Sequence, residues 1–477
     1  MFKTLLKKTG ITRQFLRKHF SPLLKLSEIF LFSTLSSTPY TACLSRFPDT
    51  FQRFNDPYCY CCYFYYLLHY ITEKRSQKQQ SQVVHSLKIR SYLKEYFMKI
   101  IFDKVKLLAA LTPAMGCVSS KNTFTSLEGV LIEASEDGRC RVMTYDMDKG
   151  VRANVAAQVI EPGSYIVNAQ DFYQYVRVMP ENEIELSVNE KMTAHLRCNR
   201  VCYTMRALNG KEFPTPPELD GEWGFVIEQS ILKTIMGSTA HSIAQTDSNH
   251  PELCGGYLQI RENLLTMVAC NTFTLSKCEY YTKINADLPS EINMIIPGKS
   301  LNELQKILSD DEEDLMTIKP AKKHVVFVIG DLIFFSRLID MKYLDYERII
   351  QGDMPITVKI NRVAFLDCLE RAALISEKKS VSSTRSHLRL HFSDNLLKIS
   401  STSLSGQIND ELPCEYSGEE LEIGFTCRFL IDVLRALDCD NVTMKLKGPR
   451  TSMYVMPTEK DEKKKQFFLV MPVKLSD

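Results

Sequence analysis

The sequence predicts an α+β protein in which a unit of two helices packed on antiparallel sheets is repeated three times along the chain. The first observation behind this prediction is a strand pattern that leads into an amphipathic helix and recurs twice at an interval of 129 residues. The second is a set of short segments in which Val, Ile, Phe and Tyr alternate with polar residues, as in half-buried antiparallel strands.

The recurring step is the most regular feature of the chain. Each strand pattern stands seven residues before the start of its helical pattern. The three copies are Tyr165–Val167 before Phe172, Met294–Ile296 before Leu301, and Ile423–Phe425 before Leu430. Such a fixed interval predicts three copies of one domain.

Further elements take their places around this step in every copy. Amphipathic helices are expected upstream, over residues 105–115, 231–243 and 363–375. Hairpins follow these helices, at 130–134 with 141–144, 257–260 with 265–269, and 388–392 with 396–400. Three more strands are expected after each second helix: 184–188, 192–198 and 201–208; 315–319, 324–329 and 332–339; and 442–447, 452–456 and 467–473.

Two breaker-rich segments, near Pro214–Pro217 and Gln351–Asp353, are expected to separate the copies. The predicted domains are therefore 98–219, 220–350 and 351–477, preceded by an extension over residues 1–97.

The extension differs in composition from the rest of the chain. Residues 1–97 carry a net charge of +10, whereas the remaining residues carry −8. A transit peptide is one interpretation, because the first forty residues are basic and poor in acids, and a membrane-surface anchor is another, because basic and aromatic residues mix there. The interpretation we favour is a misplaced start or a disordered extension, since Met98 offers a second start.

Motifs of common enzymes are missing from the sequence. It contains no P-loop, no G-x-G-x-x-G and no H-E-x-x-H, so we expect a binding protein without catalytic residues, cofactor or metal. Cys59, Cys61 and Cys62 lack zinc-site spacing, and His387 and His391 lie on an expected strand where both face solvent. The odd number of cysteines, 15, favours a reducing compartment, and we expect a cytoplasmic protein without a membrane span.

Basic residues occupy one equivalent position in each second helix, namely Arg177, Lys306 and Arg435. One interpretation is a solvated helix face. The other is a shared face that meets a polyanion, because repeats would gather these charges within an otherwise acidic body.

From Met98 to its last residues, the chain resembles the bacterial DNA polymerase III beta subunits, the sliding clamps. The resemblance is most specific in Leu332–Asp340, Tyr416–Phe425 and Val470–Leu475. It implies the DNA clamp fold, with three domains in each chain and two chains closing a six-domain ring around duplex DNA. It also implies a non-catalytic processivity factor that tethers the polymerase III catalytic subunit, the clamp loader, and other polymerases and repair proteins.

The family's partner-peptide pocket lies between the second and third domains. Carried over by position, its wall here comprises Leu253, Cys270, Thr272, Phe273, Thr274, Leu275, Leu344, Arg348, Ile349, Thr426, Phe429, Arg450, Ser452, Val470, Met471, Pro472, Val473, Lys474 and Leu475. Ordinary packing between domains is the alternative interpretation of this set.

The chain departs from the family at the pocket strand. Cys270–Leu275 stands where the family often has Thr-Asp-Gly-His-Arg-Leu, and Leu344 replaces a common proline. In the second-domain loop that contacts DNA in the family, His250–Glu252 stands where the family often has Arg-Tyr-Tyr.

The resemblance also implies contacts with DNA and with a second copy. Lys121 matches a basic residue of a loop that faces the DNA, and Tyr203, Leu374 and Ile375 match positions of the dimer interface. Internal core packing is the alternative for Leu374 and Ile375. For the whole chain, the alternative function is a monomeric three-repeat interaction scaffold that does not bind DNA.

Overall fold

The computed structural model places the described residues in one of two parts of the chain. The chain divides into Met1–Lys88 and Ile89–Asp477, and every described residue belongs to the second part. The described residues are 98–119, 124–180, 183–219, 223–247, 249–284, 291–376, 387–404 and 406–475. The predicted extension over residues 1–97, with Cys59, Cys61 and Cys62, lies outside them. Within the described ranges, no helix has the length and apolar character needed to cross a bilayer.

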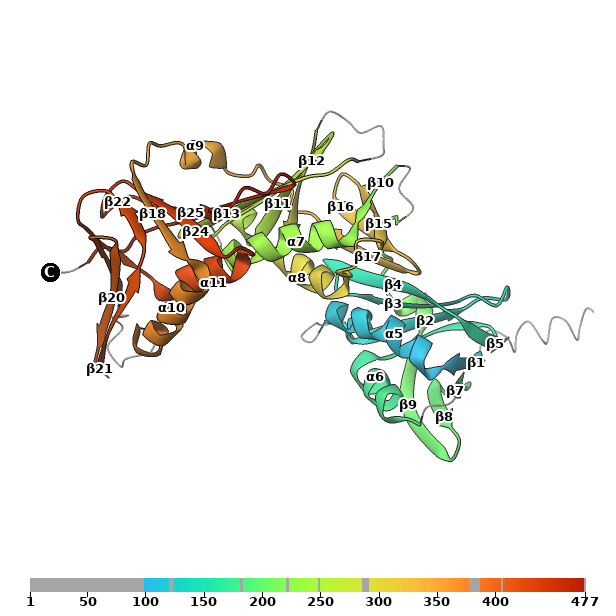
Figure 1. The fold of residues 1–477 in the computed structure, drawn as a ribbon. Helices are drawn as coiled ribbons and strands as arrows, with labels where there is room; N and C mark the ends of the chain where they lie inside the picture. Colours follow the sequence, from blue (N-terminus) through green and yellow to red (C-terminus); the bar gives the residue numbers. More distant parts are fainter. Residues whose placement is uncertain are drawn as a thin grey trace, which may run out of the picture. The chain divides into compact units, whose positions relative to one another are not determined.

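The described residues of the first domain form two α-helices and nine strands, several of which are labelled in Figure 1. In chain order they are β1 (Met98–Asp103), α5 (Lys104–Ala114), β2 (Gly129–Ala134), β3 (Cys140–Tyr145), β4 (Lys149–Val155), β5 (Ala157–Glu161), β6 (Gly163–Asn168), α6 (Ala169–Val178), β7 (Glu183–Val188), β8 (Thr193–Cys198) and β9 (Val201–Asn209).

The second domain repeats this order without a counterpart of β5 among the described residues. Its elements are β10 (Phe225–Glu228), α7 (Gln229–Thr239), β11 (Gly255–Arg261), β12 (Leu264–Cys270), β13 (Thr274–Tyr281), β14 (Ile292–Pro297), α8 (Gly298–Ile307), β15 (Leu315–Pro320), β16 (His324–Ile329) and β17 (Leu332–Arg337). The short helix α9 (Tyr346–Ile350) leads into the third domain.

The third domain follows the same plan. Its elements are β18 (Ile356–Asn361), α10 (Arg362–Ser376), β19 (Leu388–Ser393), β20 (Leu396–Ser403), β21 (Gly406–Pro413), β22 (Glu415–Ser417), β23 (Leu421–Phe425), α11 (Cys427–Ala436), β24 (Asn441–Leu446), β25 (Met453–Pro457) and β26 (Lys464–Val470). The prediction of three α+β repeats is confirmed.

The second helix of each repeat begins three residues earlier than predicted. The starts are Ala169, Gly298 and Cys427, and they keep the predicted interval of 129 residues. The first turn of each helix has little apolar periodicity, so the sequence pattern begins late. In the first domain, Asn168 caps the helix by accepting a hydrogen bond from the Asp171 N–H at 3.0 Å.

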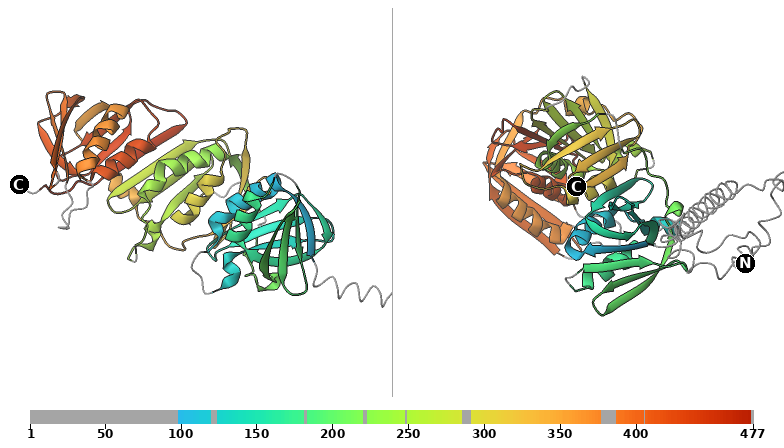
Figure 2. Two further views of the ribbon diagram at one scale, coloured as in Figure 1. Left: turned by 90° about the horizontal axis from the view of Figure 1, so that it is seen from below. Right: turned by 90° about the vertical axis from the view of Figure 1, so that its right-hand side faces the viewer.

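Antiparallel strand pairs join the domains. Strand β17 of the second domain pairs with β4 of the first, and β26 of the third pairs with β13 of the second. These two joints build a 13-stranded and a 9-stranded sheet, and β21-β20-β19-β23 forms a third sheet. The helices of each domain pack against its sheets (Figure 2). In addition, α8 contacts α5, and α11 contacts α7.

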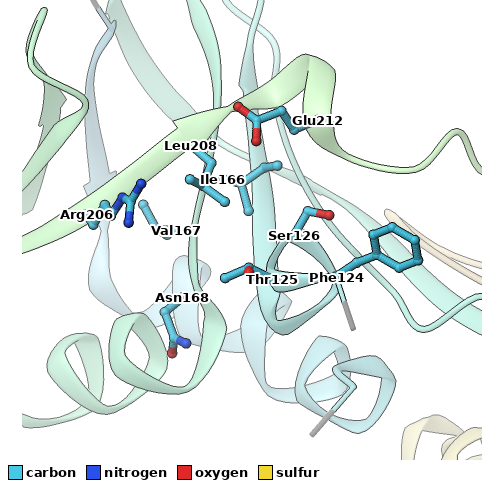
Figure 3. A pocket seen from close by; sticks show the side chains of 10 residues that line it. Phe124, Thr125, Ser126, Ile166, Val167, Asn168, Arg206, Leu208 and Glu212 are labelled. Atoms are coloured by element: carbon cyan, nitrogen blue, oxygen red, sulfur yellow. The ribbon is translucent and has the colours of Figure 1, made fainter. Parts of the chain in front are cut away.

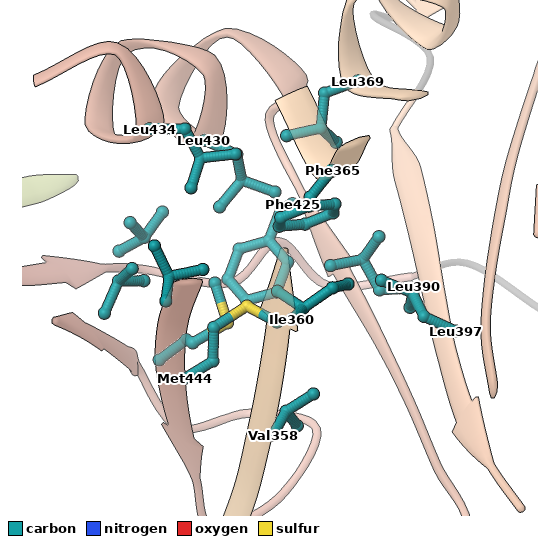
Figure 4. Packing of buried hydrophobic residues seen from close by; sticks show 14 of the residues in the cluster. Val358, Ile360, Phe365, Leu369, Leu390, Leu397, Phe425, Leu430, Leu434 and Met444 are labelled. Atoms are coloured by element: carbon teal, nitrogen blue, oxygen red, sulfur yellow. The ribbon is translucent and has the colours of Figure 1, made fainter. Parts of the chain in front are cut away.

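The core of the third domain illustrates how the helices are held (Figure 4). Phe365 and Leu369 project from one face of α10, and Leu430 and Leu434 project from one face of α11. They enclose Phe425 of β23, which is completely buried. The spacing of four residues within each pair places both side chains on the same side of their helix.

The joint between the first two domains depends on the absence of a side chain at Gly150. Gly150 of β4 lies opposite Phe335 of β17, and a Cβ atom there would meet the Phe335 ring at 2.2 Å and the Thr144 carbonyl oxygen at 2.7 Å. The ring of Phe335 therefore packs directly on the backbone of the neighbouring domain.

We predict that Gly150→Ala destabilises the protein by about 1–3 kcal/mol, because the added methyl group overpacks the joint. The measurement is the melting temperature by circular dichroism. Gly448→Ala is the matched control, since a Cβ at Gly448 would meet no atom within 4 Å. Equal melting temperatures for the two variants would contradict this account of the joint.

Candidate functional site

A cavity of about 230 Å³ lies where the second domain meets the third. Its walls come from the 3-10 helix η8 (Pro251–Cys254), the β12–β13 turn, the segment around α9 and the end of β26. The lining residues are His250, Glu252, Leu253, Cys270, Thr272, Phe273, Thr274, Leu275, Leu344, Ile349, Leu469 and Met471. Most of them are apolar, so the cavity suits apolar side chains of a ligand.

The β12–β13 turn is held by one amide side chain. The Asn271 Oδ1 atom accepts hydrogen bonds from the Phe273 N–H at 3.1 Å, the Thr274 N–H at 2.8 Å and the Thr274 hydroxyl at 3.1 Å. Thr272 has a φ of +71°, which a β-branched residue seldom adopts. The turn leaves Phe273 57% exposed, with its ring stacked on Phe429 of the third domain at 5.7 Å between centroids.

The C-terminal tail connects this turn with the third domain. The Met471 N–H donates to the Phe273 carbonyl oxygen, and the Val473 N–H donates to the Gly424 carbonyl oxygen, both at 2.9 Å. Leu475 packs on Gly424, where a Cβ atom would meet its side chain at 2.5 Å. The tail is therefore anchored at two points, and Met471 reaches the cavity from the first of them.

Burial keeps two ionisable side chains at the cavity in their neutral form. It raises the pKa of the Cys270 thiol and that of the neighbouring Tyr343 phenol, so both groups stay neutral at physiological pH. Glu252 carries a carboxylate on the wall, and its Oε1 atom lies 3.2 Å from the His250 Nδ1 atom.

The three equivalent helix positions carry exposed cations. Arg177, Lys306 and Arg435 each stand eight residues after the first residue of α6, α8 and α11. The Lys306 Nζ atom pairs with Glu303 at 2.9 Å, and the Arg435 guanidinium pairs with Glu370 at 2.7 Å. All three cations are therefore on solvent-facing surfaces, where they can reach a large anion.

Two strand edges of the described residues bear on how a second copy could join the chain. The Val201–Arg206 part of β9 pairs only with β8, and β21 pairs only with β20. Tyr203, on the first edge, stacks on Tyr175 with 4.2 Å between ring centroids. Near the second edge, Ile375 lies beside Gly406, and the Leu374 side chain is 69% exposed.

Sequence models of one protein family match most of the described part of the chain. Models of the N-terminal, central and C-terminal domains of the DNA polymerase III beta subunit match residues 98–217, 226–345 and 347–474. The chain belongs to this family. Its members are sliding clamps, so the predictions of a clamp fold and of a non-catalytic subunit are confirmed.

Individual members of the family agree with this assignment. A beta sliding clamp of Halalkalibacterium halodurans is 28% identical over 378 residues, covering 76% of this chain and 97% of the relative. The solved sliding clamp of Bacillus subtilis is 26% identical, with a TM-score of 0.72 over 80% of this chain and 100% of that one. A clamp of Pseudomonas aeruginosa bound to griselimycin is also 26% identical, with a TM-score of 0.71 over 79% and 100%.

The structure brings together part of the pocket wall predicted from the clamp family. Nine predicted residues line the cavity: Leu253, Cys270, Thr272, Phe273, Thr274, Leu275, Leu344, Ile349 and Met471. The other predicted residues lie outside the lining: Arg348, Thr426, Phe429, Arg450, Ser452, Val470, Pro472, Val473, Lys474 and Leu475. Among them, Val470 is completely buried in the core of the third domain, and Arg348 points to solvent with its side chain 84% exposed.

Three lining residues were missed by the sequence-based set. His250 and Glu252 were considered only as a departure in a DNA loop, whereas η8 turns both toward the cavity. Leu469 stands two residues before Met471, and the period of two along a strand places both on one face, which could have identified it.

The remaining predicted residues have mixed outcomes. Lys121 lies outside the described residues. Leu374 is exposed, so its interpretation as core is wrong. His391 faces partly outward from β19, as predicted, and its Nε2 atom lies 3.0 Å from Glu420. Within the described ranges, no cluster of three or more potential metal ligands occurs.

A second cavity, of about 540 Å³, lies in the first domain of the clamp (Figure 3). Its lining combines Ile166, Val167 and Asn168 at the end of β6 with Arg206 and Leu208 of β9. The side chain of Arg206 lies at one side of this cavity and that of Glu212 at another (Figure 3). The cavity therefore adjoins the unpaired edge of β9.

We predict that Asn271→Ala lowers the stability of the clamp by about 1–3 kcal/mol, because two backbone N–H groups and one hydroxyl lose their acceptor. Amide hydrogen exchange at Phe273 and Thr274 should accelerate, and the melting temperature should fall. Asn271→Asp keeps an acceptor oxygen and should retain slow exchange. Unchanged exchange in Asn271→Ala would show that the turn is held by other contacts.

Proposed function

We propose that two copies of this chain close into a ring around duplex DNA and that the cavity between the second and third domains tethers replication enzymes to that ring. The observation that carries the proposal is the pair of strand edges left over after the two joints within the chain. The acidic body with basic helix positions supports the DNA part, and the apolar cavity supports the tethering part.

The two joints within the chain use equivalent strands in equivalent register. In both cases the third strand after the first helix pairs with the last strand of the following domain. Arg152 lies opposite Ile333 in the first joint, and Lys277 lies opposite Phe467 in the second. Traced through the hairpin registers of each domain, these two pairs occupy the same structural position.

Among the described residues, the same rule leaves one strand of each kind without a partner from another domain. Those strands are β21 of the third domain and the Val201–Arg206 edge of β9 in the first. A second copy supplies a partner for each of these two edges, so two copies satisfy both and the assembly closes on itself.

We call the register shared by the two joints within the chain the inherited register, and apply it to the contact between two copies. In this register the side chains of the two edges are complementary. It places Ile408 opposite Tyr203, and each of these packs partly against the core of its own domain. It places Glu411 opposite Arg200, which gives a pair of opposite charge. Leu374 and Ile375 lie beside this edge and add apolar surface to the closing contact.

Sequence-independent DNA contact is supported by the charge distribution. Arg177, Lys306 and Arg435 repeat once per domain, while residues 98–477 carry a net charge of −8. Cations at regular positions attract phosphates of any sequence, and the acidic remainder repels DNA from other surfaces.

The partners of the cavity are, in this proposal, the polymerase III catalytic subunit, the clamp loader, and other polymerases and repair proteins, all acting in the cytoplasm. A clamp performs no chemistry, so tethering is its contribution to replication. An apolar cavity of moderate size suits a short peptide whose few anchor side chains carry most of the affinity.

We predict that the protein remains on nicked circular DNA during gel filtration and leaves when the DNA is linearised. The variant Arg177→Glu, Lys306→Glu, Arg435→Glu should be retained less, with a deficit that increases with salt, because phosphate contacts are lost. The control reverses Arg139, Lys359 and Arg389, which lie on strands or their turns and give the same change in net charge. Elution as a monomer with no DNA retention would instead favour the scaffold function.

We predict that Asn409→Cys forms a covalent dimer with the native Cys202 of a second copy. The inherited register places the two residues opposite each other, with Cα atoms about 5.5 Å apart, within reach of a disulfide or a short bis-maleimide. Cys202 is exposed, as that chemistry requires. The readout is the dimer fraction on a denaturing gel.

The double variant Asn409→Cys, Cys202→Ser is the control for this cross-link, because other cysteines of the chain remain in it. Gln407→Cys, two residues along the same exposed edge, tests the register and should cross-link less. An equal yield in all three variants would refute the proposed register.

A further inference from the structure

The wall of the pocket between the second and third domains carries one carboxylate among largely apolar neighbours. Glu252 belongs to η8, and its side chain is only 14% exposed. It lies next to Leu253 in the chain, and Leu344 and Met471 line the same cavity. An ionised carboxylate in such a place is stable while water still reaches it.

The groups around this carboxylate leave its charge largely uncompensated. The described lining contains no Lys or Arg. Within this lining, the one polar contact of the Glu252 carboxylate is the His250 ring at 3.2 Å, and the His250 side chain is 58% exposed. Arg348 is next in the chain to the lining residue Ile349, but its guanidinium pairs with Asp345 at 2.9 Å.

The other polar groups of the lining do not offer a positive charge either. The Cys270 thiol is neutral, because burial raises its pKa. The Thr274 hydroxyl donates to Asn271 and also meets the Ser242 hydroxyl at 2.9 Å. A ligand that covers the wall with apolar atoms alone would therefore remove water from Glu252 and put nothing in its place.

We propose that Glu252 is a selectivity residue of this pocket, which takes a partner segment that combines apolar anchors with a Lys or Arg side chain directed at Glu252. The proposal rests on the function proposed above. The cation replaces the water that the segment displaces and forms a charge-assisted hydrogen bond. A segment with an acidic side chain at that position meets a like charge and is rejected.

His250 modulates this preference from the pocket rim. Its ring is the contact that Glu252 already has, so it competes with the incoming cation. Removing the ring in His250→Ala frees the carboxylate and should strengthen the preference for a basic segment.

The test uses three fluorescent peptides that share one apolar sequence and carry Lys, norleucine or Glu at a single position beside the anchors, scanned over each flanking position. Affinity is measured by fluorescence anisotropy with the full chain. At one position the wild-type protein should bind the Lys peptide roughly tenfold more tightly than the Glu peptide. In Glu252→Gln this ratio should fall to within about twofold, and in His250→Ala it should rise.

Glu347→Gln is the matched control, because Glu347 is an exposed acid beside the pocket segment but outside the lining. It should keep the wild-type ratio. If Glu347→Gln reduces the ratio as much as Glu252→Gln does, the preference comes from the general field of the surface, and the role of Glu252 is refuted. An unchanged ratio in Glu252→Gln refutes it as well, provided the variant melts like the wild type.

The same experiment separates this proposal from the one on which it rests. Failure of the norleucine peptide to bind the wild-type protein argues against tethering at this pocket. Tight binding of all three peptides with equal affinity leaves tethering intact and overturns the selectivity of Glu252.

Discussion

Backbone pairing between the last strand of one domain and the third strand of the domain before it is the interaction on which the rest of this structure depends. A domain of this kind ends in strands whose N–H and C=O groups require partners. The joints β4–β17 and β13–β26 satisfy them without dedicated linker domains. Because each joint is part of a larger sheet, the helices of neighbouring domains also come into contact, as α8 does with α5 and α11 with α7.

The pocket is a consequence of the second joint. Pairing β13 with β26 brings the turn before β13 next to the tail that follows β26, and the Met471 N–H then donates to Phe273. Neither domain alone could provide both sides of the cavity. The two joints also differ chemically: a buried Lys149–Asp146 ion pair lies at the first, whereas hydrogen-bonded Ser242, Thr274 and Ser276 hydroxyls lie at the second. The copies have therefore diverged in the side chains that accompany their joints.

The sequence predicted the repeat and most of its helices and hairpins, because apolar periodicity is strong wherever one face is buried. It failed at the first strands β1, β10 and β18, at the third strands β4, β13 and β21, and at the short strands β5 and β22, for which no pattern was recognised. β21 alternates between half-buried and exposed residues, and among the described residues its outer edge has no partner strand. Joint strands of this kind are defined by contacts far along the chain, which local periodicity does not record.

The candidate site was predictable to a similar degree. Leu275 and Met471 could be assigned by position in the family, whereas Glu252 could not, since its orientation depends on how η8 turns before β11. Val470 shows the opposite error, because strand alternation directs it into the core while its neighbour Met471 faces outward. A residue's place in a motif therefore locates the site, but the local backbone decides which side chains line it.

The cations proposed to face DNA suit a ring that is held together by its strand pairs. A ring that slides must attract DNA without holding it at one place. Lys306 and Arg435 each already pair with a carboxylate, so a phosphate that binds either cation competes with Glu303 or Glu370. Such exposed pairs contribute little stability and exchange partners readily. In the proposed ring, closure through paired strand edges supplies the persistence on DNA, which leaves the individual contacts weak enough to permit movement.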